Sequence, residues 1–349
     1  MEVPALSTGQ YPISHYARIL RPGLPRDAFA PSPGRLLWLV VHGALAITGI
    51  VAITYGWGGH PALVGFTLLI GHSFAVMAFV AHETLHGSIV RNKSLRIIIG
   101  WIGFLPLTIS PTHWIAWHNR IHHGHTMRVG EDPDAFPTLA IYRSSLLTRA
   151  GDHLTFGAGR LRGFIGLLIG FSTQSFSVLF LMDRQRKYLS TKAFALAIAE
   201  TLAGLAVWAT LAAFLGAWAF LWAYVVPMLI ANAIVMAYIM SNHSLNPLTE
   251  INDPLLNSLS VTNPRILEIL HLGFGMHVEH HLFPAMSPRH ARFVRAELRD
   301  KFPDRYQTMS LAQAISRVFH VAHVYLDGST LVDPLTGRTW PTLAPRDQR

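Results

Sequence analysis

Eight of the 20 histidines in this 349-residue chain fall into three short clusters. The clusters are HETLH with His82 and His86, HNRIHH with His118, His122 and His123, and HVEHH with His277, His280 and His281. Imidazole is a common metal ligand, and residues three or four apart share one face of a helix. Each cluster can therefore present several nitrogens to one ion, and together they predict a metal centre built from histidine.

The number of histidines indicates two ions rather than one. A structural zinc takes four ligands and a catalytic zinc usually takes three and a water, so eight imidazoles exceed the needs of a single ion. Iron binds imidazole well and reacts with O₂. In HNRIHH an ideal α-helix aligns His118 with His122 and turns His123 away by about 100°. We expect such an adjacent pair to serve two neighbouring metals.

The composition is typical of a membrane protein. Hydrophobic residues make up 51% of the chain and charged residues only 13%, whereas soluble domains carry roughly 25% charged residues. The absence of cysteine excludes disulfides, cysteine-bound zinc and iron–sulfur clusters within this chain. The net charge of +9 does not indicate nucleic-acid binding, because Lys and Arg are absent from 36–90 and 193–264 and gather elsewhere. That distribution follows the positive-inside rule.

Four apolar stretches reach the roughly 20 residues that a membrane span needs. They form two hairpins with very short loops and comprise residues 36–57, 61–81, 193–216 and 218–240. Two further apolar stretches, 95–110 and 163–182, are predicted to be interfacial or re-entrant. If 95–110 crossed the membrane, HETLH and HNRIHH would lie on opposite sides and could not share a site. We therefore expect an all-α integral membrane protein with four transmembrane helices and a cytoplasmic helical cap that holds a di-metal site.

The remaining segments are expected to lie on the cytoplasmic side. Residues 1–35 have no signal-peptide pattern and read as a proline-rich cytoplasmic lead-in to a membrane domain at 36–330. The chain after Pro284 alternates basic and apolar residues, which predicts an amphipathic helix near the membrane surface. Residues 331–349 are predicted to be a C-terminal tail, loose from about Thr336.

The three clusters resemble the histidine boxes of the integral-membrane fatty acid desaturase and hydroxylase superfamily. That pattern is H-x(3–4)-H, then H-x(2–3)-HH, then (H or Q)-x(2–3)-HH, and all eight positions match here. HVEHHLFP is also similar to the HHLFP stretch of many bacterial acyl desaturases. The resemblance implies a non-haem di-iron enzyme of a membrane, most simply a bacterial inner membrane. It would use O₂ to introduce a double bond into an acyl chain.

The resemblance also implies partners and a substrate class. Two electrons would come from a separate ferredoxin or b-type cytochrome system with its reductase. The acyl chain would be carried by a lipid, coenzyme A or acyl carrier protein. Arg289, Arg292 and Arg295 could dock the electron donor, or they could contact lipid head groups.

A ninth ligand is implied just after the fourth span, where MSNHSLNP places His243. Some family members have an Asn one turn earlier, but this chain has Ile239 there, so Asn242 or Asn232 is only a weak substitute. His125, in HHGHT, is either a further ligand or a hydrogen-bonding partner of one.

Several other residues have both a functional and a structural interpretation. The acidic residues of GEDPDAF are Glu131, Asp132 and Asp134. They could orient His122 or His123 by hydrogen bonding, or they could be solvated side chains of a proline turn. Glu200 lies inside an apolar stretch, and snorkelling to the interface is its simplest explanation. His72 is predicted to be a packed or tunnel-lining residue. Trp101, Trp114 and Trp117 could line an acyl tunnel but are more simply interfacial anchors.

Two other functions stay open. Carotenoid ketolases and hydroxylases, and lipid hydroxylases, share the boxes, and HETLHGSIV is similar to carotenoid ketolases. Their reaction begins with the same hydrogen abstraction and differs in what happens to the radical. A membrane metal-binding or haem-binding protein is the non-enzyme alternative, although haem would need opposed histidines within the spans.

Overall fold

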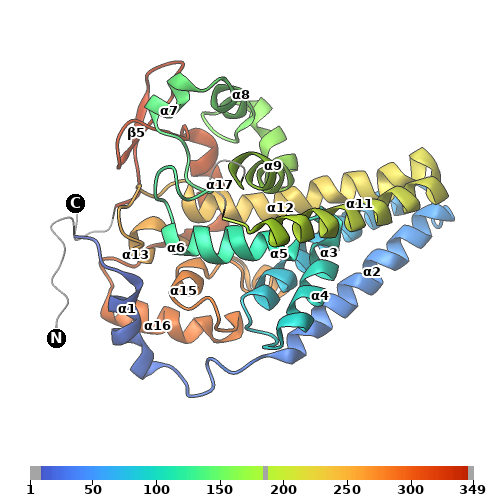
Figure 1. The fold of residues 1–349 in the computed structure, drawn as a ribbon, viewed down its shortest axis with the longest axis horizontal. Coiled ribbons are helices and arrows are strands. Elements are labelled where there is room, and N and C mark those ends of the chain that lie inside the picture. Colours follow the sequence, from blue (N-terminus) through green and yellow to red (C-terminus); the bar gives the residue numbers. More distant parts are fainter. Residues whose placement is uncertain (1–8, 184–187, 345–349) are drawn as a thin grey trace. The chain divides into compact units, whose positions relative to one another are not determined.

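The computed structural model describes residues 9–183 and 188–344, and nearly all of its regular structure is helical (Figure 1). The chain divides into two compact units. The span unit comprises Pro31–Trp117 and Leu167–Met236. The histidine unit comprises Met1–Ala30, His118–Gly166 and Ala237–Arg349.

The first hairpin of the span unit is made by α2 (Leu36–Thr54) and α3 (Gly59–Leu85), preceded by a short 3-10 turn, η2 (Pro33–Arg35). Gly56 and Gly58 in its turn have φ of 66° and 75°, a conformation that other residues avoid. These two helices correspond to the first two predicted spans.

The second hairpin contains α11 (Thr191–Phe220), the π-helical η7 (Leu221–Val225) and α12 (Val226–His243). Gly216 interrupts α11 with φ 73° and ψ 165°, next to Ala217, where the sequence predicts the turn. After this break η7 contacts α11, α2 and α3, so the chain has reversed direction within the span unit.

A broken helical segment lies between the two hairpins in sequence. It contains α4 (Lys93–Phe104), the 3-10 turn η3 (Leu105–Leu107) and α5 (Pro111–Trp114), and it bends by 101° between Leu107 and Pro111. Trp208 Nε1 donates to the carbonyl of Leu105 at 2.8 Å, and the Tyr224 hydroxyl donates to that of Pro106 at 3.2 Å. Irregular backbone at membrane depth is tolerated only where protein satisfies its polar groups. The second hairpin supplies those partners.

Glu200 of α11 also binds this broken segment. Its Oε2 accepts hydrogen bonds from Ser110 Oγ at 2.5 Å and from the Thr112 backbone N–H at 3.1 Å, and its Oε1 accepts from Thr112 Oγ1 at 2.8 Å. A carboxylate is favourable at a helix N-terminus, here that of α5. Three donors therefore hold the partly buried Glu200 carboxylate against this segment, and snorkelling is not needed to explain an acid in this apolar stretch.

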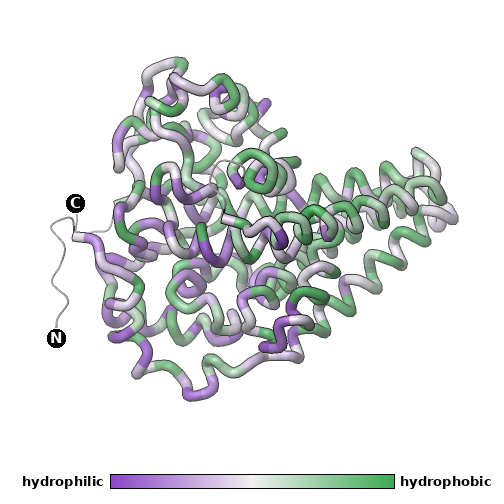
Figure 2. The backbone as a smooth tube through the Cα atoms, viewed as in Figure 1, coloured by the Kyte–Doolittle hydropathy of each residue, from purple (hydrophilic) through white to green (hydrophobic). Residues whose placement is uncertain are grey.

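Four helical segments of the described chain are long and apolar enough to cross a membrane, and Figure 2 shows hydrophobic residues along α2, α3 and α11. The segments are Pro33–Thr54, Gly59–Leu85, Leu161–Met182 and Thr191–His243. The last has 53 residues and includes the Gly216 break, so it holds both helices of the second hairpin. Leu161–Met182 contains α9 (Phe164–Ser177) and the π-helical η6 (Val178–Met182). Its length and composition permit a span as well as the predicted interfacial position.

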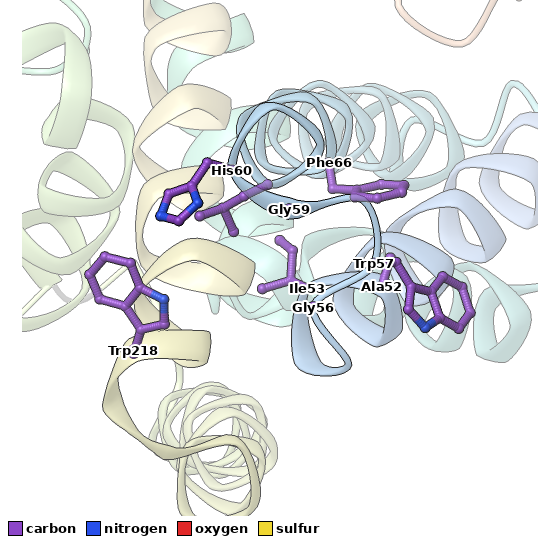
Figure 3. Close-up of a pocket in the computed structure, with 9 residues that line it drawn as sticks. Ala52, Ile53, Gly56, Trp57, Gly59, His60, Phe66 and Trp218 are labelled. Atoms are coloured by element: carbon purple, nitrogen blue, oxygen red, sulfur yellow. The ribbon is translucent and has the colours of Figure 1, made fainter.

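A pocket of about 170 Å³ lies at the turn of the first hairpin (Figure 3). Trp57, His60 and Trp218 are among its lining residues. Both tryptophans are exposed, as is usual for tryptophan at a membrane–water interface. His60 is the only ionisable side chain that lines the pocket, so it offers no cluster of metal ligands.

The N-terminal segment of the histidine unit is folded from Ile13 onward. It forms α1 (Ile13–Leu20), whose Tyr16 and Leu20 are fully buried in a core shared with α16 (Ala291–Lys301). The Tyr16 hydroxyl donates to the buried carboxylate of Asp253 at 2.9 Å. Part of the predicted N-terminal lead-in is therefore folded into a packed core.

The predicted amphipathic helix after Pro284 is present as α16. Its apolar residues Ala291, Val294 and Leu298 are buried in the same core as α1. This face therefore packs on protein rather than on the membrane surface.

The C-terminal region forms small sheets. β1 (Ser260–Thr262) pairs in parallel with β2 (Thr308–Ser310), while β3 (Val324–Tyr325), β4 (Thr330–Val332) and β5 (Thr339–Pro341) form an antiparallel sheet. The loose tail predicted from Thr336 is wrong as far as Pro341, because β5 pairs with β4; residues 345–349 lie outside the described part. The other helices of the described part of this unit include α6 (His123–His125), α7 (Leu139–Ser144), α8 (Leu146–Leu154), α13 (Pro254–Asn257), α14 (Arg265–Leu270), α15 (His277–Leu282), α17 (Leu311–His320), η1 (Arg21–Gly23), η5 (Leu161–Gly163) and η8 (Pro288–His290).

Candidate metal centre

The histidine unit brings together four histidines from three segments of the chain. His122 ends the π-helix η4 (Ile115–His122), His243 ends α12, and His277 and His281 lie on α15. All four are buried, and one nitrogen of each lies within 4.8 Å of those of the others. We call them the four-histidine cluster.

The closest atoms in this cluster are Nε2 nitrogens. His277 Nε2 lies 2.7 Å from His243 Nε2 and 3.0 Å from His281 Nε2, and His281 Nε2 lies 3.3 Å from His122 Nε2. Around a tetrahedral ion with metal–nitrogen bonds of about 2.0–2.1 Å, ligand nitrogens are roughly 3.4 Å apart. The spacing of the imidazoles is thus close to that of a coordination shell.

The other ring nitrogen of two members is held by a group that can only accept. His122 Nδ1 donates to Asp132 Oδ1 at 3.0 Å, and His243 Nδ1 donates to the backbone carbonyl of Asn257 at 3.1 Å. In the neutral form of each ring Nδ1 carries the proton, so Nε2 keeps a lone pair. Although burial lowers it, the Asp132 and Asp134 carboxylates raise the pKa of His122 to about 9, so a metal that binds this ring must displace its second proton. Partners of this kind orient metal-binding histidines and fix their tautomer.

His281 is held in the same way by Thr126. The Thr126 hydroxyl donates to the backbone carbonyl of His122 at 2.7 Å, so its oxygen can accept from His281 Nδ1, 3.3 Å away. Three Nε2 lone pairs therefore face one small buried space. Lone pairs this close repel one another unless a cation lies between the rings. The donor set therefore fits a transition metal.

Burial keeps the histidines of α15 neutral. Desolvation, with the nearby His122 and His243 adding to it, lowers the pKa of His280 to about 3. Desolvation also lowers the pKa of His277 and His281 well below the usual value. Only the neutral imidazole can bind a metal, so these rings are ready ligands at neutral pH.

A second set of ring nitrogens lies in the same unit. His123 Nε2 is 3.2 Å from His118 Nε2 and 3.1 Å from His280 Nε2. The expectation that His123 turns away from His118 is wrong, because residues five apart share a face in a π-helix. His122 therefore faces the four-histidine cluster while its neighbour His123 faces this second set.

The first box lies in the span unit, at the end of α3. The rings of His82 and His86 are 4.7 Å apart, and both pack edge-on against Trp114 at 5.2 and 5.3 Å. The intervening Glu83 is buried and accepts a hydrogen bond from Arg35 Nε at 2.5 Å. The one-turn spacing thus places both imidazoles on one side of the helix.

Two of the three tryptophans that the sequence predicts to be interfacial anchors are buried. Trp114 and Trp117 are each 1% exposed, so the anchor interpretation is wrong for both. Trp101 Nε1 donates to the Glu200 carbonyl at 2.9 Å. His72, by contrast, packs 5.5 Å from the ring of His42 and outside the histidine clusters, as predicted.

Of the acids in GEDPDAF, Asp132 and Asp134 lie against His122. Asp132 is 3% exposed, and its Oδ2 accepts from the Met127 backbone N–H at 2.7 Å. Asp134 Oδ2 lies 3.4 Å from His122 Nδ1. Glu131 instead pairs with His125, at 2.9 Å. The orienting role thus fits Asp132 first and Asp134 second.

The Asp132→Asn variant should bind metal about 10–100-fold more weakly, as is typical when a residue that orients a ligand is changed. Its amide can still face His122 but loses the negative charge that holds Nδ1–H. Metal titration against a competing chelator measures the change. Asp134→Asn is the matched control and should cost less, because its carboxylate is farther from the ring. Equal affinity of Asp132→Asn and the parent protein would contradict the assignment.

The additional candidates lie outside the two sets of nitrogens. The ring of His125 is 38% exposed and contacts Glu131. The Asn242 amide is buried and makes no hydrogen bond within the described residues. Asn232 accepts from the backbone N–H of Ser172 and donates to the backbone carbonyl of Met228, each at 3.0 Å, so it serves helix packing.

The three arginines considered for electron-donor docking have different surroundings. Arg289 and Arg292 are exposed. Arg295 Nε donates to Glu279 Oε1 at 2.7 Å, and this arginine is only 14% exposed. Arg295 therefore does not fit the docking role, because it neutralises a buried carboxylate of the third box.

Some residues of the site carry no sequence signal. Asn257 supplies the carbonyl that holds His243, and its side chain donates to the Thr126 carbonyl at 3.1 Å. Asn252 Nδ2 donates to the carbonyl of His123 at 2.7 Å. Only Thr126 could have been suspected, because it lies one helical turn after His122.

Comparisons with known proteins agree with the chemistry of this site. The family described as "Fatty acid desaturase" matches residues 59–312. The sn-1 oleoyl-lipid 12-desaturase of Synechocystis sp. is 22% identical over 86% of this chain and 87% of its own length. The sn-1 oleoyl-lipid 12-desaturase of Arthrospira platensis is 23% identical over 71% and 72%. A sn-1 acyl-lipid omega-3 desaturase (ferredoxin) of Synechocystis sp. is 30% identical over 34% and 33%. Since the family match covers well over half of the sequence and all three histidine boxes, the chain belongs to the fatty acid desaturase family.

Proposed function

We propose that this protein is a membrane-bound, O₂-dependent desaturase that introduces a double bond into the acyl chain of a membrane lipid. The observation that carries the proposal is the convergence of buried Nε2 lone pairs in the four-histidine cluster. The named relatives act on oleoyl-lipid or acyl-lipid, which supports a lipid-borne acyl chain as substrate.

Two iron ions would be held by nine histidines. The four-histidine cluster would hold one ion, and His118, His123 and His280 would contribute to the other. His82 and His86 are assigned to this second ion on the basis of the histidine-box pattern. Bound iron supplies the ability to reduce O₂ and to remove hydrogen from an unactivated methylene. The protein keeps the imidazoles of α15 neutral, fixes the tautomers of His122, His243 and His281 through Asp132, Asn257 and Thr126, and excludes bulk water by burial.

Electrons would come from a ferredoxin, since one relative is named as a ferredoxin-dependent desaturase. A b-type cytochrome system is the alternative donor. The charge distribution supports four spans with both termini and the histidine unit on the cytoplasmic side, in a bacterial inner membrane.

The test is lipid profiling of a bacterial host that expresses the full chain together with a ferredoxin and its reductase. The expected result is a new acyl species with two hydrogens fewer, absent from cells that express the His277→Ala variant at the same level. Purified protein should contain about two iron ions per chain. A hydroxylated or ketolated product would instead establish the hydroxylase or ketolase alternative. A protein with one zinc or one haem and no product would be a metal-binding or haem-binding protein.

A further inference from the structure

One helix of the histidine unit turns its apolar side outward. None of the residues of α8 is buried, and Leu146 and Leu147 are 76% and 68% exposed. Leu154, two turns later on the same side, is also exposed. A surface helix of a soluble protein buries such a stripe against its core. Something other than this unit must therefore cover these leucines.

The end of α8 packs tightly against the start of Leu161–Met182. A Cβ atom at Gly166 would lie 2.3 Å from the Leu154 carbonyl oxygen, and one at Gly163 would lie 2.5 Å from the Thr155 carbonyl oxygen. Only glycine permits these close approaches. The two helices therefore form one continuous surface at this point.

The start of that segment is also apolar on its outer side. Leu161 is 77% exposed, and Phe164 and Ile165 are exposed as well. The segment as a whole is long and apolar enough to enter a membrane. Lipid that covers Leu161 and Phe164 would extend over the neighbouring leucines of α8.

Basic residues border this apolar surface. Arg143 and Arg162 are exposed, and Arg149 Nη1 donates to the Arg143 carbonyl at 2.8 Å. The nearby Asp152 is engaged by Arg160 at 3.1 Å, so it does not neutralise the others. Arginine beside outward-facing leucine is the pattern of helices that lie in the head-group region of anionic bilayers.

We propose that the α8 surface, defined as Leu146, Leu147, Leu154 and Leu161 with Arg143 and Arg162, inserts into the head-group region of an anionic bilayer. The leucines reach the acyl boundary while the two arginines bind lipid phosphates. This surface is separate from the metal centre and goes beyond the proposed reaction. It gives the histidine unit its own attachment to the membrane, in addition to the spans.

The absence of cysteine makes single-site spin labelling straightforward. Leu147→Cys reports on the α8 surface. Asp300→Cys on α16, where the side chain is 77% exposed, is the water reference, and Leu68→Cys on α3, 55% exposed, is the lipid reference. Each labelled full-length protein is placed in vesicles of phosphatidylethanolamine and phosphatidylglycerol. The label's collision rates with O₂ and with a water-soluble nickel chelate are then measured.

The ratio of O₂ to nickel accessibility at Leu147→Cys should exceed that at Asp300→Cys several-fold and approach that at Leu68→Cys. It should fall when phosphatidylglycerol is omitted or when Arg143 and Arg162 are both changed to Gln. A ratio equal to the water reference would overturn the proposal. So would a label shielded from both reagents and coupled to a label on another copy, because a second chain would then cover the helix. The readout needs no iron or turnover, so it is independent of the proposed reaction.

Discussion

Replacing His277 by alanine is expected to abolish product formation and to remove one of the two metal ions. His277 lies centrally in the four-histidine cluster, with its Nε2 next to those of His243 and His281. Changes to residues that merely orient a ligand already cost about 10–100-fold in affinity or activity. Loss of a ligand should therefore lower turnover by more than about 100-fold. Iron content per chain and turnover with reduced ferredoxin measure the two effects.

The matched control is His290→Ala. His290 is also buried, on η8, but lies outside both sets of nitrogens and accepts a hydrogen bond from Arg289 Nε at 2.8 Å. This variant should keep its iron and most of its turnover. Full iron content and normal turnover in His277→Ala would refute the assignment of the cluster. Membrane insertion of both variants should be unchanged, since neither position lies within a predicted span.

The histidine boxes were predictable because ligand spacing on a helix is local. His277 and His281 are one turn apart, and α15 presents them side by side as the pattern requires. The approach of His243 to them was expected only from the family resemblance, since it depends on how α12 packs. The position of His123 was missed because the sequence carries no mark of the π-helix that ends at His122.

The interior surroundings of the broken segment were less predictable. A carboxylate inside an apolar stretch and tryptophans near a membrane end suggest interfacial positions. In the structure Glu200 is fixed by Ser110 and Thr112, and Trp114 packs against both rings of the first box. These contacts join residues far apart in sequence, and local pattern contains no information about them.

Each box has a buried carboxylate beside its histidines. Glu83 in the first box pairs with Arg35, and Asp132 after the second holds His122. Glu279 in the third pairs with Arg295. A helix that presents metal ligands must be fixed in position and must not rotate about its own axis. A buried carboxylate that is paired with a residue of another segment provides both constraints. The Glu279–Arg295 pair should matter most, because α15 is only six residues long.

Replacing Glu279 by alanine should therefore destabilise the protein strongly. Glu279 is fully buried and accepts hydrogen bonds from the Ser260 hydroxyl, from Arg295 Nε at 2.7 Å and from the Tyr306 hydroxyl at 2.6 Å. Removing one partner of a buried ion pair costs about 3–5 kcal/mol, because the other charge is left uncompensated. Since the entropy of unfolding is about 2.1 cal/mol/K per residue, a chain of 349 residues should lose roughly 4–7 °C in Tm. Thermal unfolding followed by tryptophan fluorescence in detergent measures it.

A double variant, Glu279→Met with Arg295→Met, separates stability from orientation. It leaves no buried charge unpaired, so most of the lost Tm should return. At about 100° per residue, Glu279 lies on the side of α15 opposite His277 and His281. It therefore fixes the helix through the face that does not carry these histidines. Iron affinity should consequently stay low in the double variant even where Tm recovers. Recovery of both would mean that the pair only balances charge, and an unchanged Tm in Glu279→Ala would contradict the prediction itself.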